Sequence, residues 1–345
     1  MLFDAADLDA HEAVHVLHDA TSGLKAIIAI HSTHLGPAAG GVRRWTYAED
    51  AAALADALRL SKGMSYKNAM AGLPMGGGKA VLLAEGEKTE ALLEAFGDQV
   101  AALGGRYVTA EDVGMTEADM VVVARRTRHV AGLPVAPGAE VGGNPGPWTA
   151  EGVFAGLKAA VRHRLGRADL AGVHVAVQGV GSVGGALAAM LAAAGARLTL
   201  ADVDAARAAG LAARLGAAHV PVSAITRVAA DVFSPNALGG VLDAQSVAAL
   251  DVAVVAGAAN NQLATPEDGD RLAARGILYA PDYVINAGGI INVVAEYLGG
   301  ATQASVRQQI AAIPERLASI FTEADRSGQS THAVADAMAR RLIGR

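Results

Sequence analysis

A glycine-rich turn that joins an apolar strand to an alanine-rich helix constrains the fold of this chain more than any other feature. Residues 173–184 read Val-His-Val-Ala-Val-Gln-Gly-Val-Gly-Ser-Val-Gly, which places Gly179, Gly181 and Gly184 in a Gly-x-Gly-x-x-Gly pattern. The first glycine permits a tight turn, the second lets the backbone approach a pyrophosphate, and the third lets helix and strand pack closely. The N–H groups at the helix start, around Ser182 and Val183, are suited to bind phosphate. The pattern therefore predicts a dinucleotide-binding unit.

An acidic residue at the end of the next expected strand indicates which dinucleotide binds. Asp202 lies eighteen residues after Gly184. A carboxylate at this place can accept hydrogen bonds from the adenosine ribose and would repel a 2′-phosphate. We therefore expect NAD, rather than NADP, as the cofactor.

The sequence around this turn repeats strands and helices, which is typical of a parallel sheet covered by helices. The expected strands are His174–Gln178, Leu198–Asp202, Val232–Phe233, Val252–Ala256 and Ile277–Ala280. A chain of 345 residues is long enough for two domains. The glycine- and proline-rich run Pro134–Pro147 is the expected boundary between them, and Ser305–Arg345 has a helical pattern.

The residues before this boundary also alternate between strands and helices. They predict a hairpin from Ala13–Leu17 and Leu24–His31, helices at Ala48–Met64 and Thr89–Leu103, and strands at Ala80–Ala84 and Arg106–Ala110. We therefore predict an α/β protein with a cleft between two domains. Residues 1–135 would form an α/β domain, and residues 146–315 a Rossmann-type NAD-binding domain. Helices in residues 316–345 would pack back on the first domain.

A cluster of lysines in the first domain indicates where chemistry takes place. Three of the six lysines, Lys62, Lys67 and Lys79, lie in one short stretch that is otherwise rich in Met, Ala and Gly. Burial among apolar groups would lower the pKa of a lysine towards neutrality, where the amine can act as a base. Asp112 follows a strand-like run further along the chain and could complete a proton-transfer pair.

Other motifs in the same region have simpler explanations. Ala80 follows Lys79 where a phosphate-binding P-loop needs Ser or Thr. His11 and His15 have the spacing of a zinc-protease motif, but that chemistry needs a helix and the pattern here predicts a strand. No metal site is expected. The pair Gly152 and Gly156 predicts a close contact between helices.

Composition narrows the functional classes further. The net charge is −6 at pH 7 without a basic run, so nothing favours binding to nucleic acid. The chain has no cysteine, which fits a reducing compartment. No window holds about twenty uninterrupted apolar residues, and the acidic N-terminus lacks the positive charge of a secretory signal. We expect a cytoplasmic protein that does not bind membranes.

Several segments, in the same order, resemble the leucine/phenylalanine/valine dehydrogenase group of the amino-acid dehydrogenase superfamily. They extend over nearly the whole chain: Gly36–Arg43, Met64–Asn68, Gly76–Lys79, Thr109–Gly114, Gly257–Gln262 and Tyr279–Gly289. The resemblance implies reversible, NAD-dependent oxidative deamination of an L-amino acid to a 2-oxo acid, NADH and ammonium. It also implies a homo-oligomer, with residues 1–135 as the substrate-binding and oligomerisation domain.

The same resemblance implies roles for individual residues. Lys67 would hold the substrate carboxylate, and Lys79 would activate the water that attacks the imino intermediate. Asp112 would shuttle protons to and from the substrate nitrogen. The remaining contacts would come from Gly40 and Gly41 as a wall against the substrate, Asn286 near the substrate, and Thr149, Ala258, Asn260 and Asn261 near the nicotinamide.

The residues of the expected side-chain pocket leave two substrate classes open. Ala39 stands where the glutamate branch has a lysine, and with Val293 on the far wall it offers a second carboxylate no cation. Ala110 matches the branched-chain enzymes and Ile290 narrows the pocket, whereas the small Ala39 resembles the phenylalanine branch. A single methylene changes discrimination by only about 1–3 kcal/mol. We predict a branched-chain substrate (leucine, valine or isoleucine), with phenylalanine as the alternative. An inactive NAD-binding regulatory protein is the rival from another class.

Two positions depart from the family pattern. Asn236 lies in a Ser-Pro-Asn-Ala run where the family has Pro-Cys-Ala, and Trp148 precedes Thr149 where a small aliphatic residue is usual. Neither is expected to be catalytic, but Trp148 leaves the exact nicotinamide contacts open.

Overall fold

The computed structural model describes residues 4–135 and 138–345. Residues 1–3 of the acidic N-terminus and residues 136–137 of the expected boundary run lie outside the described residues. The described chain forms two compact units, and neither is continuous in sequence. Unit 1 contains the described part of Met1–Asn144 together with Ile290–Val306 and Ala339–Arg345. Unit 2 contains Pro145–Gly289 and Arg307–Met338.

Unit 1 is built on a mixed sheet with the strand order β1-β2-β5-β3-β6, in which β4 also pairs with β5. The strands are β1 Ala13–Asp19, β2 Leu24–Ser32, β3 Ala38–Ala39, β4 Val42–Trp45, β5 Gly76–Leu83 and β6 Tyr107–Val108. Strand β2 pairs antiparallel with both β1 and β5, whereas β3 and β4 run parallel to β5. The expected hairpin is confirmed. The strand expected at Ala80 begins earlier, at Gly76, and the short β3 and β4 were not predicted.

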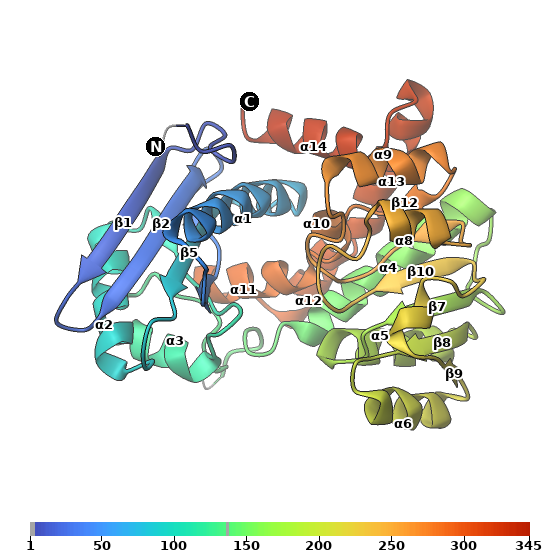
Figure 1. Cartoon of the computed structure of the whole chain (residues 1–345), viewed down its shortest axis with the longest axis horizontal. Coiled ribbons are helices and arrows are strands. Elements are labelled where there is room, and N and C mark those ends of the chain that lie inside the picture. The colour runs from blue at the N-terminus through green and yellow to red at the C-terminus, as the bar shows by residue number, and fades with distance from the viewer. Residues whose placement is uncertain (1–3, 136–137) are drawn as a thin grey trace. The chain divides into compact units, whose positions relative to one another are not determined.

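Helices cover both faces of this sheet (Figure 1). They are α1 Asp50–Met70 on one face and α2 Glu90–Ala102 with α3 Glu117–Ala124 on the other. Alternation along β2 supplies both cores, because successive strand residues point to opposite faces. Ile27 packs in one cluster with Leu58 of α1, and Ile28 packs in the other with Phe96 of α2.

The same alternation along β5 determines where its lysine lies. Val81 belongs to the cluster under α1, and Leu82 belongs to the cluster under α2. Lys79 is two residues before Val81, so it lies on the face that α1 covers. Gly77 lies on that face as well, because a Cβ there would meet the backbone nitrogen of Ser65 in α1 at 2.0 Å.

Unit 2 is built on a parallel sheet with the strand order β12-β11-β10-β7-β8-β9. The strands are β7 His174–Gln178, β8 Arg197–Ala201, β9 Ala218–His219, β10 Val232–Pro235, β11 Val254–Val255 and β12 Leu278–Tyr279. The first strand in sequence lies at the centre, and the chain builds outwards on one side before it crosses to the other. This is the Rossmann order, and the crevice between β7 and β10 is where such sheets bind dinucleotides. The expected strands of this sheet are confirmed.

Helices accompany these strands along the chain (Figure 1). In unit 2 they are α4 Gly146–Leu165, α5 Ser182–Ala193, α6 Ala205–Leu215, α7 Val222–Ile225, α8 Ala244–Ala249, α9 Pro266–Ala274, α10 Asp282–Ile285 and α13 Ile313–Ser327. A Cβ on Gly152 or Gly156 of α4 would lie 2.9 Å from Ile313 Cδ1 or 2.8 Å from Leu317 Cδ1 of α13, respectively. The expected close helix contact is therefore confirmed, and α13 is the partner.

The remaining helices begin in one unit and end in the other. They are α11 Gly288–Leu298, α12 Gln303–Ile310 and α14 Thr331–Leu342. The expected single C-terminal block is thus divided, because α13 packs on α4 while residues 339–345 belong to unit 1. There Arg345 donates to His31 Nε2 and to the His31 carbonyl oxygen, both at 2.7 Å, and Arg340 donates to the Tyr66 hydroxyl at 2.8 Å.

A search of the described residues finds no helix with the length and apolar character needed to cross a membrane.

Candidate active site

Three consecutive glycines allow β5 to carry a buried lysine. A Cβ on Gly76 would lie 1.9 Å from the carbonyl oxygen of Ser32, and one on Gly78 would lie 2.8 Å from the Tyr107 ring. Together with the contact of Gly77 to α1, these distances show that only glycine fits between the neighbouring strand, ring and helix. The next residue, Lys79, is 5% exposed.

Lys79 forms one side of a compact network of charges. Its Nζ lies 3.0 Å from Asp112 Oδ2, and the same oxygen accepts from Arg43 Nε at 2.9 Å. Arg43 also donates to Asp56 Oδ2 at 3.0 Å, and the Tyr47 hydroxyl donates to that atom at 2.5 Å. The structure therefore brings together the expected pair Lys79 and Asp112 and adds three residues to it.

Burial and charge act against each other in this network. Burial lowers the pKa of Lys79 because the charged amine loses water; Asp112 opposes this effect and Arg43 adds to it. Burial alone would raise the pKa of Asp112, but the charges of Lys79 and Arg43 prevail and hold it below its usual range. The carboxylate is therefore ionised, and the amine loses its proton more easily than an exposed lysine.

The expected substrate wall lies beside this pair. A Cβ on Gly40 would meet the carbonyl oxygen of Gly78 at 1.9 Å, and one on Gly41 would meet the carbonyl oxygen of Glu111 at 2.5 Å. The Tyr107 hydroxyl donates to the Gly40 carbonyl oxygen at 2.6 Å. The backbone at Gly40 and Gly41 thus packs closely against the carbonyl groups of Gly78 and Glu111, the residues just before Lys79 and Asp112, and leaves no room for a side chain.

Other expected pocket residues lie in unit 1, and their roles remain predictions. Lys67 lies half-buried in the last turn of α1, two residues beyond the contact of Ser65 with β5. Ala39 is buried in register with Gly77, and Ala110 is half-buried after β6. Ile290 and Val293 are half-buried on α11 and share one side of that helix, since they are three residues apart.

The glycine turn has the form that the sequence predicts. Gly179 has φ +87°, in the region that favours glycine, and a Cβ on Gly184 would lie 1.9 Å from the Gly179 carbonyl oxygen. Helix α5 begins at Ser182, followed by Val183, and its N-cap Gly181 provides no side-chain cap. Nothing lies within 4 Å of a Cβ built on Gly181. The turn therefore leaves open space before uncapped N–H groups, which fits a dinucleotide pyrophosphate.

Asp202 lies next to this turn. Its Oδ2 accepts from Val180 N at 2.8 Å and its Oδ1 from Asp204 N at 2.9 Å, with Arg207 Nη1 at 3.5 Å. These backbone N–H groups help to hold its pKa below the ordinary value although burial opposes them. Each carboxylate oxygen retains an acceptor site, as a ribose contact would require.

The residues expected near the nicotinamide lie in unit 2, together with Asn286, which is expected near the substrate. Asn286 Nδ2 donates to the Ala258 carbonyl oxygen at 3.1 Å and to Asn260 Oδ1 at 2.8 Å. Its own Oδ1 is buried and has no hydrogen-bond partner among the described residues. Asn261 follows with φ +51°, and Thr149 donates to the Pro145 carbonyl oxygen at 3.0 Å. An unpartnered, buried amide oxygen is an acceptor that a bound ligand could satisfy.

Asn236 holds the loop of residues 257–262 against β10. Its Oδ1 accepts from Ala258 N at 2.9 Å, and its Nδ2 donates to the Ser234 carbonyl oxygen at 2.8 Å. Its backbone also packs on the turn, since a Cβ on Gly179 would meet the Asn236 carbonyl carbon at 3.0 Å. The departure from the family pattern is thus a structural link between the glycine turn and the 257–262 loop.

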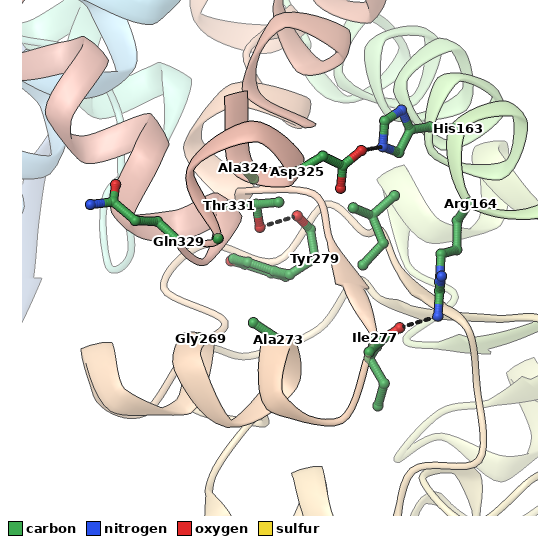
Figure 2. Close-up of a pocket in the computed structure, with 13 residues that line it drawn as sticks. His163, Arg164, Gly269, Ala273, Ile277, Tyr279, Ala324, Asp325, Gln329 and Thr331 are labelled. Carbon is green, nitrogen blue, oxygen red and sulfur yellow. Dashed lines mark hydrogen bonds and ion pairs between the residues drawn. The ribbon is translucent and has the colours of Figure 1, made fainter. Parts of the chain in front are cut away.

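A cavity of about 360 Å³ in unit 2 contains none of the expected site residues (Figure 2). Its polar groups bind one another: His163 Nε2 lies 3.0 Å from Asp325 Oδ2, and Arg164 donates to the Gly276 carbonyl oxygen at 2.6 Å. Thr331 donates to the Tyr279 carbonyl oxygen at 2.6 Å. We assign no chemistry to this cavity. No group of His, Cys, Asp or Glu within residues 4–135 and 138–345 is arranged to hold a metal ion.

Sequence reasoning missed Arg43, Asp56 and Tyr47 as members of the site. Arg43 lies within the family-like segment Gly36–Arg43, so its position was available although no role was assigned to it. Asp56 and Tyr47 lie outside every motif. An acidic residue on a helix, such as Asp56, does not indicate a site by itself. Its role becomes visible only when the fold places Arg43 of the neighbouring strand beside it.

The two units and the buried lysine–aspartate pair are those of an oxidoreductase with a dinucleotide-binding domain. Residues 10–129 match the domain described as Glu/Leu/Phe/Val dehydrogenase, dimerisation domain, and residues 199–340 match Glutamate/Leucine/Phenylalanine/Valine dehydrogenase. The chain therefore belongs to the Glu/Leu/Phe/Val dehydrogenase family, as the resemblance implied.

Similar proteins cover the chain almost completely. Leucine dehydrogenase from Geobacillus stearothermophilus is 45% identical, over 99% of this chain and 93% of that enzyme. Valine dehydrogenase from Streptomyces albus is 46% identical, over 98% of this chain and 93% of that enzyme. The crystal structure of L-tryptophan dehydrogenase from Nostoc punctiforme has a TM-score of 0.86 at 42% identity, with 97% of this chain and 96% of that chain covered.

Proposed function

We propose that this chain catalyses the reversible, NAD-dependent oxidative deamination of a branched-chain L-amino acid to the 2-oxo acid, NADH and ammonium. The observation that carries the proposal is the buried contact of 3.0 Å between Lys79 and Asp112 in a member of this family. Similarity to both a leucine and a valine dehydrogenase over nearly the whole chain supports the substrate class.

Each charged residue of the site has a distinct task in this reaction. Lys67 binds the substrate carboxylate, which orients the α-carbon. NAD, which the glycine turn and Asp202 would hold, would supply the hydride acceptor for that carbon. Lys79 in its neutral form removes a proton from the water that adds to the resulting imino carbon. Asp112, ionised at the start, takes a proton from the substrate ammonium before hydride transfer and returns it to the nitrogen of the water adduct. Ammonia then leaves as the carbon–oxygen double bond forms, and the proton of the adduct hydroxyl passes to the Asp112 carboxylate.

The cofactor assignment rests on the turn and on Asp202. The space before α5 and the glycine spacing fit a pyrophosphate. The carboxylate of Asp202, with two backbone N–H groups directed at it, is ionised and would repel a 2′-phosphate. We therefore propose NAD as the preferred cofactor.

A substrate panel tests this function. Reduction of NAD and of NADP should be measured with L-leucine, L-valine, L-isoleucine, L-phenylalanine, L-tryptophan and L-glutamate. We expect the branched-chain substrates with NAD to give the highest kcat/KM and glutamate to be inactive, because the buried Ala39 and the half-buried Val293 offer no cation. A higher kcat/KM for L-phenylalanine would establish the alternative, a phenylalanine dehydrogenase. L-tryptophan is included because the chain is similar to an L-tryptophan dehydrogenase. NADH binding without ammonium-dependent oxidation by any 2-oxo acid would establish an inactive regulatory protein.

We also propose that the chain assembles as a homo-oligomer through unit 1. The matched domain over residues 10–129 is described as a dimerisation domain. Light scattering of the pure protein should give a multiple of the 34.7 kDa chain mass; a single-chain mass at micromolar concentration would contradict this proposal.

A further inference from the structure

Arg43 joins the Lys79–Asp112 pair to α1 through contacts that no expected role explains. Its guanidinium spans two carboxylates, with Nε at 2.9 Å from Asp112 Oδ2 and Nη1 at 3.0 Å from Asp56 Oδ2. Lys79 reaches the same Asp112 oxygen at 3.0 Å. Asp112 Oδ2 therefore contacts two cations. The carboxylate of Asp56 binds the other side of the Arg43 guanidinium.

Strand register and helix packing fix this arrangement in the folded chain. Arg43 pairs with Val81 in the parallel β4–β5 ladder, so its side chain lies on the face that carries Lys79. The neighbouring Val42 is fully buried on the opposite face and pairs with Ala80. The Arg43 side chain is 23% exposed, and its planar fork presents donors in a fixed geometry.

We propose that Arg43 is a positioning residue of the reaction: held by Asp56, it orients the Asp112 carboxylate and supplies the charge that keeps the Lys79 amine ready to release its proton. The inference rests on the proposed function, because Arg43 acts through the two residues assigned to proton transfer. It deepens that function by extending the site to α1, with Asp56 as its outer member.

The charges of the network act on Lys79 in opposite directions. Asp112 favours the protonated amine, Arg43 disfavours it, and Asp56 favours it from behind the arginine. The other titratable groups around the network are the Tyr47 hydroxyl on Asp56 and the buried Tyr107 hydroxyl, bonded to the Gly40 carbonyl oxygen. Lys67 lies on the same helix as Asp56, in its last turn. Removal of the arginine charge should therefore raise the pKa of Lys79, and removal of the Asp56 charge should lower it.

The test uses Arg43→Gln, Asp56→Asn and Arg43→Lys in the full-length protein. Because the neutral amine is the active base, kcat/KM for oxidative deamination should rise with pH through the apparent pKa of the coupled pair. In Arg43→Gln we expect this limb to move to higher pH by about one unit, and in Asp56→Asn to lower pH by about half a unit. Arg43→Lys should leave the rising part of the pH profile at nearly the same pH, because the positive charge remains. It should lower kcat, because the planar guanidinium that orients Asp112 is lost.

A measurement without catalysis separates this inference from the proposed function. Competitive acetylation by acetic anhydride, read for the Lys79 peptide by mass spectrometry, follows the proton on that amine even in an inactive protein. The matched control is Arg44→Gln, on the same strand, whose guanidinium donates to the Gly86 carbonyl oxygen outside the network. It should leave the titration of Lys79 unchanged.

Opposite shifts for the Arg43→Gln and Asp56→Asn variants, in acetylation and in kcat/KM, would support the inference. Shifts in the same direction, or no shift in either, would overturn it, because damage to packing has no reason to follow the sign of the removed charge. If the wild-type protein proves inactive while the acetylation shifts persist, the proposed function fails and the network remains.

Discussion

At the residue scale, the site depends on one amine that is buried beside one acid. A lysine with 5% exposure and no carboxylate would release its proton or resist burial, because the charged form loses most of its hydration. Asp112, whose Oδ2 lies 3.0 Å from Lys79 Nζ, compensates for part of the lost hydration. The amine can therefore be protonated or neutral. A base that works near neutral pH needs this balance.

We expect Lys79→Ala to lower kcat by about 10²–10⁴-fold, the contribution typical of a general base. NADH binding should persist, since the glycine turn and Asp202 belong to the other unit. Lys62→Ala is the matched control on α1, where Lys62 pairs with Asp9 at 2.6 Å. Steady-state kinetics and NADH fluorescence titration measure the two effects. Turnover of Lys79→Ala within a few-fold of the control would contradict the assigned base.

At the element scale, β5 shows what the sequence could and could not predict. Ala80–Ala84 has the apolar pattern of a strand, and this part was predicted. The three preceding glycines weaken a strand by themselves, and they are strand residues here only because Ser32, Ser65 and Tyr107 approach their backbones. Those neighbours come from other parts of the chain, so no local pattern contains them. The Rossmann strands other than the two-residue β9, which was not predicted, were predicted well because each lies between local turn and helix signals.

The same limit applies to the site. Lys79, Asp112 and the glycine turn were predicted because they lie in motifs that chemistry restricts. Asp56 was not, because its role depends on the register that places Arg43 beside Val81. The short strands β3 and β4 were missed for the same reason, since two to four residues carry no periodicity of their own.

Gly77→Ala tests the close approach of β5 and α1. A Cβ there would lie 2.0 Å from Ser65 N, so backbone must move, and we expect a loss of about 1–3 kcal/mol in the free energy of unfolding. Gly63→Ala is the matched control on α1, where a Cβ meets nothing within 4 Å. It should gain about 0.5–1 kcal/mol from helix propensity. Urea unfolding midpoints measure both changes in stability. Equal stability of the two variants would show that the close packing of Gly77 on α1 does not contribute to the free energy of unfolding.

At the scale of the whole molecule, both units contain segments that are distant in sequence. Unit 1 gains its last contacts from residues 339–345, where Arg345 bonds to His31. Arginine can only donate, so His31 Nε2 accepts, and the ring carries its proton on Nδ1, which donates to Ser65 Oγ at 2.7 Å. Burial, with Arg345 and His11 acting in the same direction, lowers the pKa of His31 to about 3.

The neutral His31 makes stability depend on pH. Its pKa in the unfolded chain is about 6.5, above the folded value, so the stabilisation is complete above pH 6.5 and is lost as the pH falls towards about 3. We expect a decline of about 1 kcal/mol per pH unit in this window from this group. In His31→Asn the slope between pH 6.5 and pH 5 should be shallower, and in the exposed His18→Asn it should equal wild type. Unchanged slopes in the His31 variant would contradict a neutral, buried histidine.

The return of the chain to unit 1 has a consequence for biosynthesis. The first unit lacks two of its three segments until residues 290–306 are made, and it lacks the last one until residues 339–345 are made, so its hydrophobic surfaces stay incomplete until then. Unit 2 likewise waits for residues 307–338, which carry α13. Nascent chains should therefore depend on protection by chaperones until release, and the first unit should not be obtainable by expressing the gene up to residue 144.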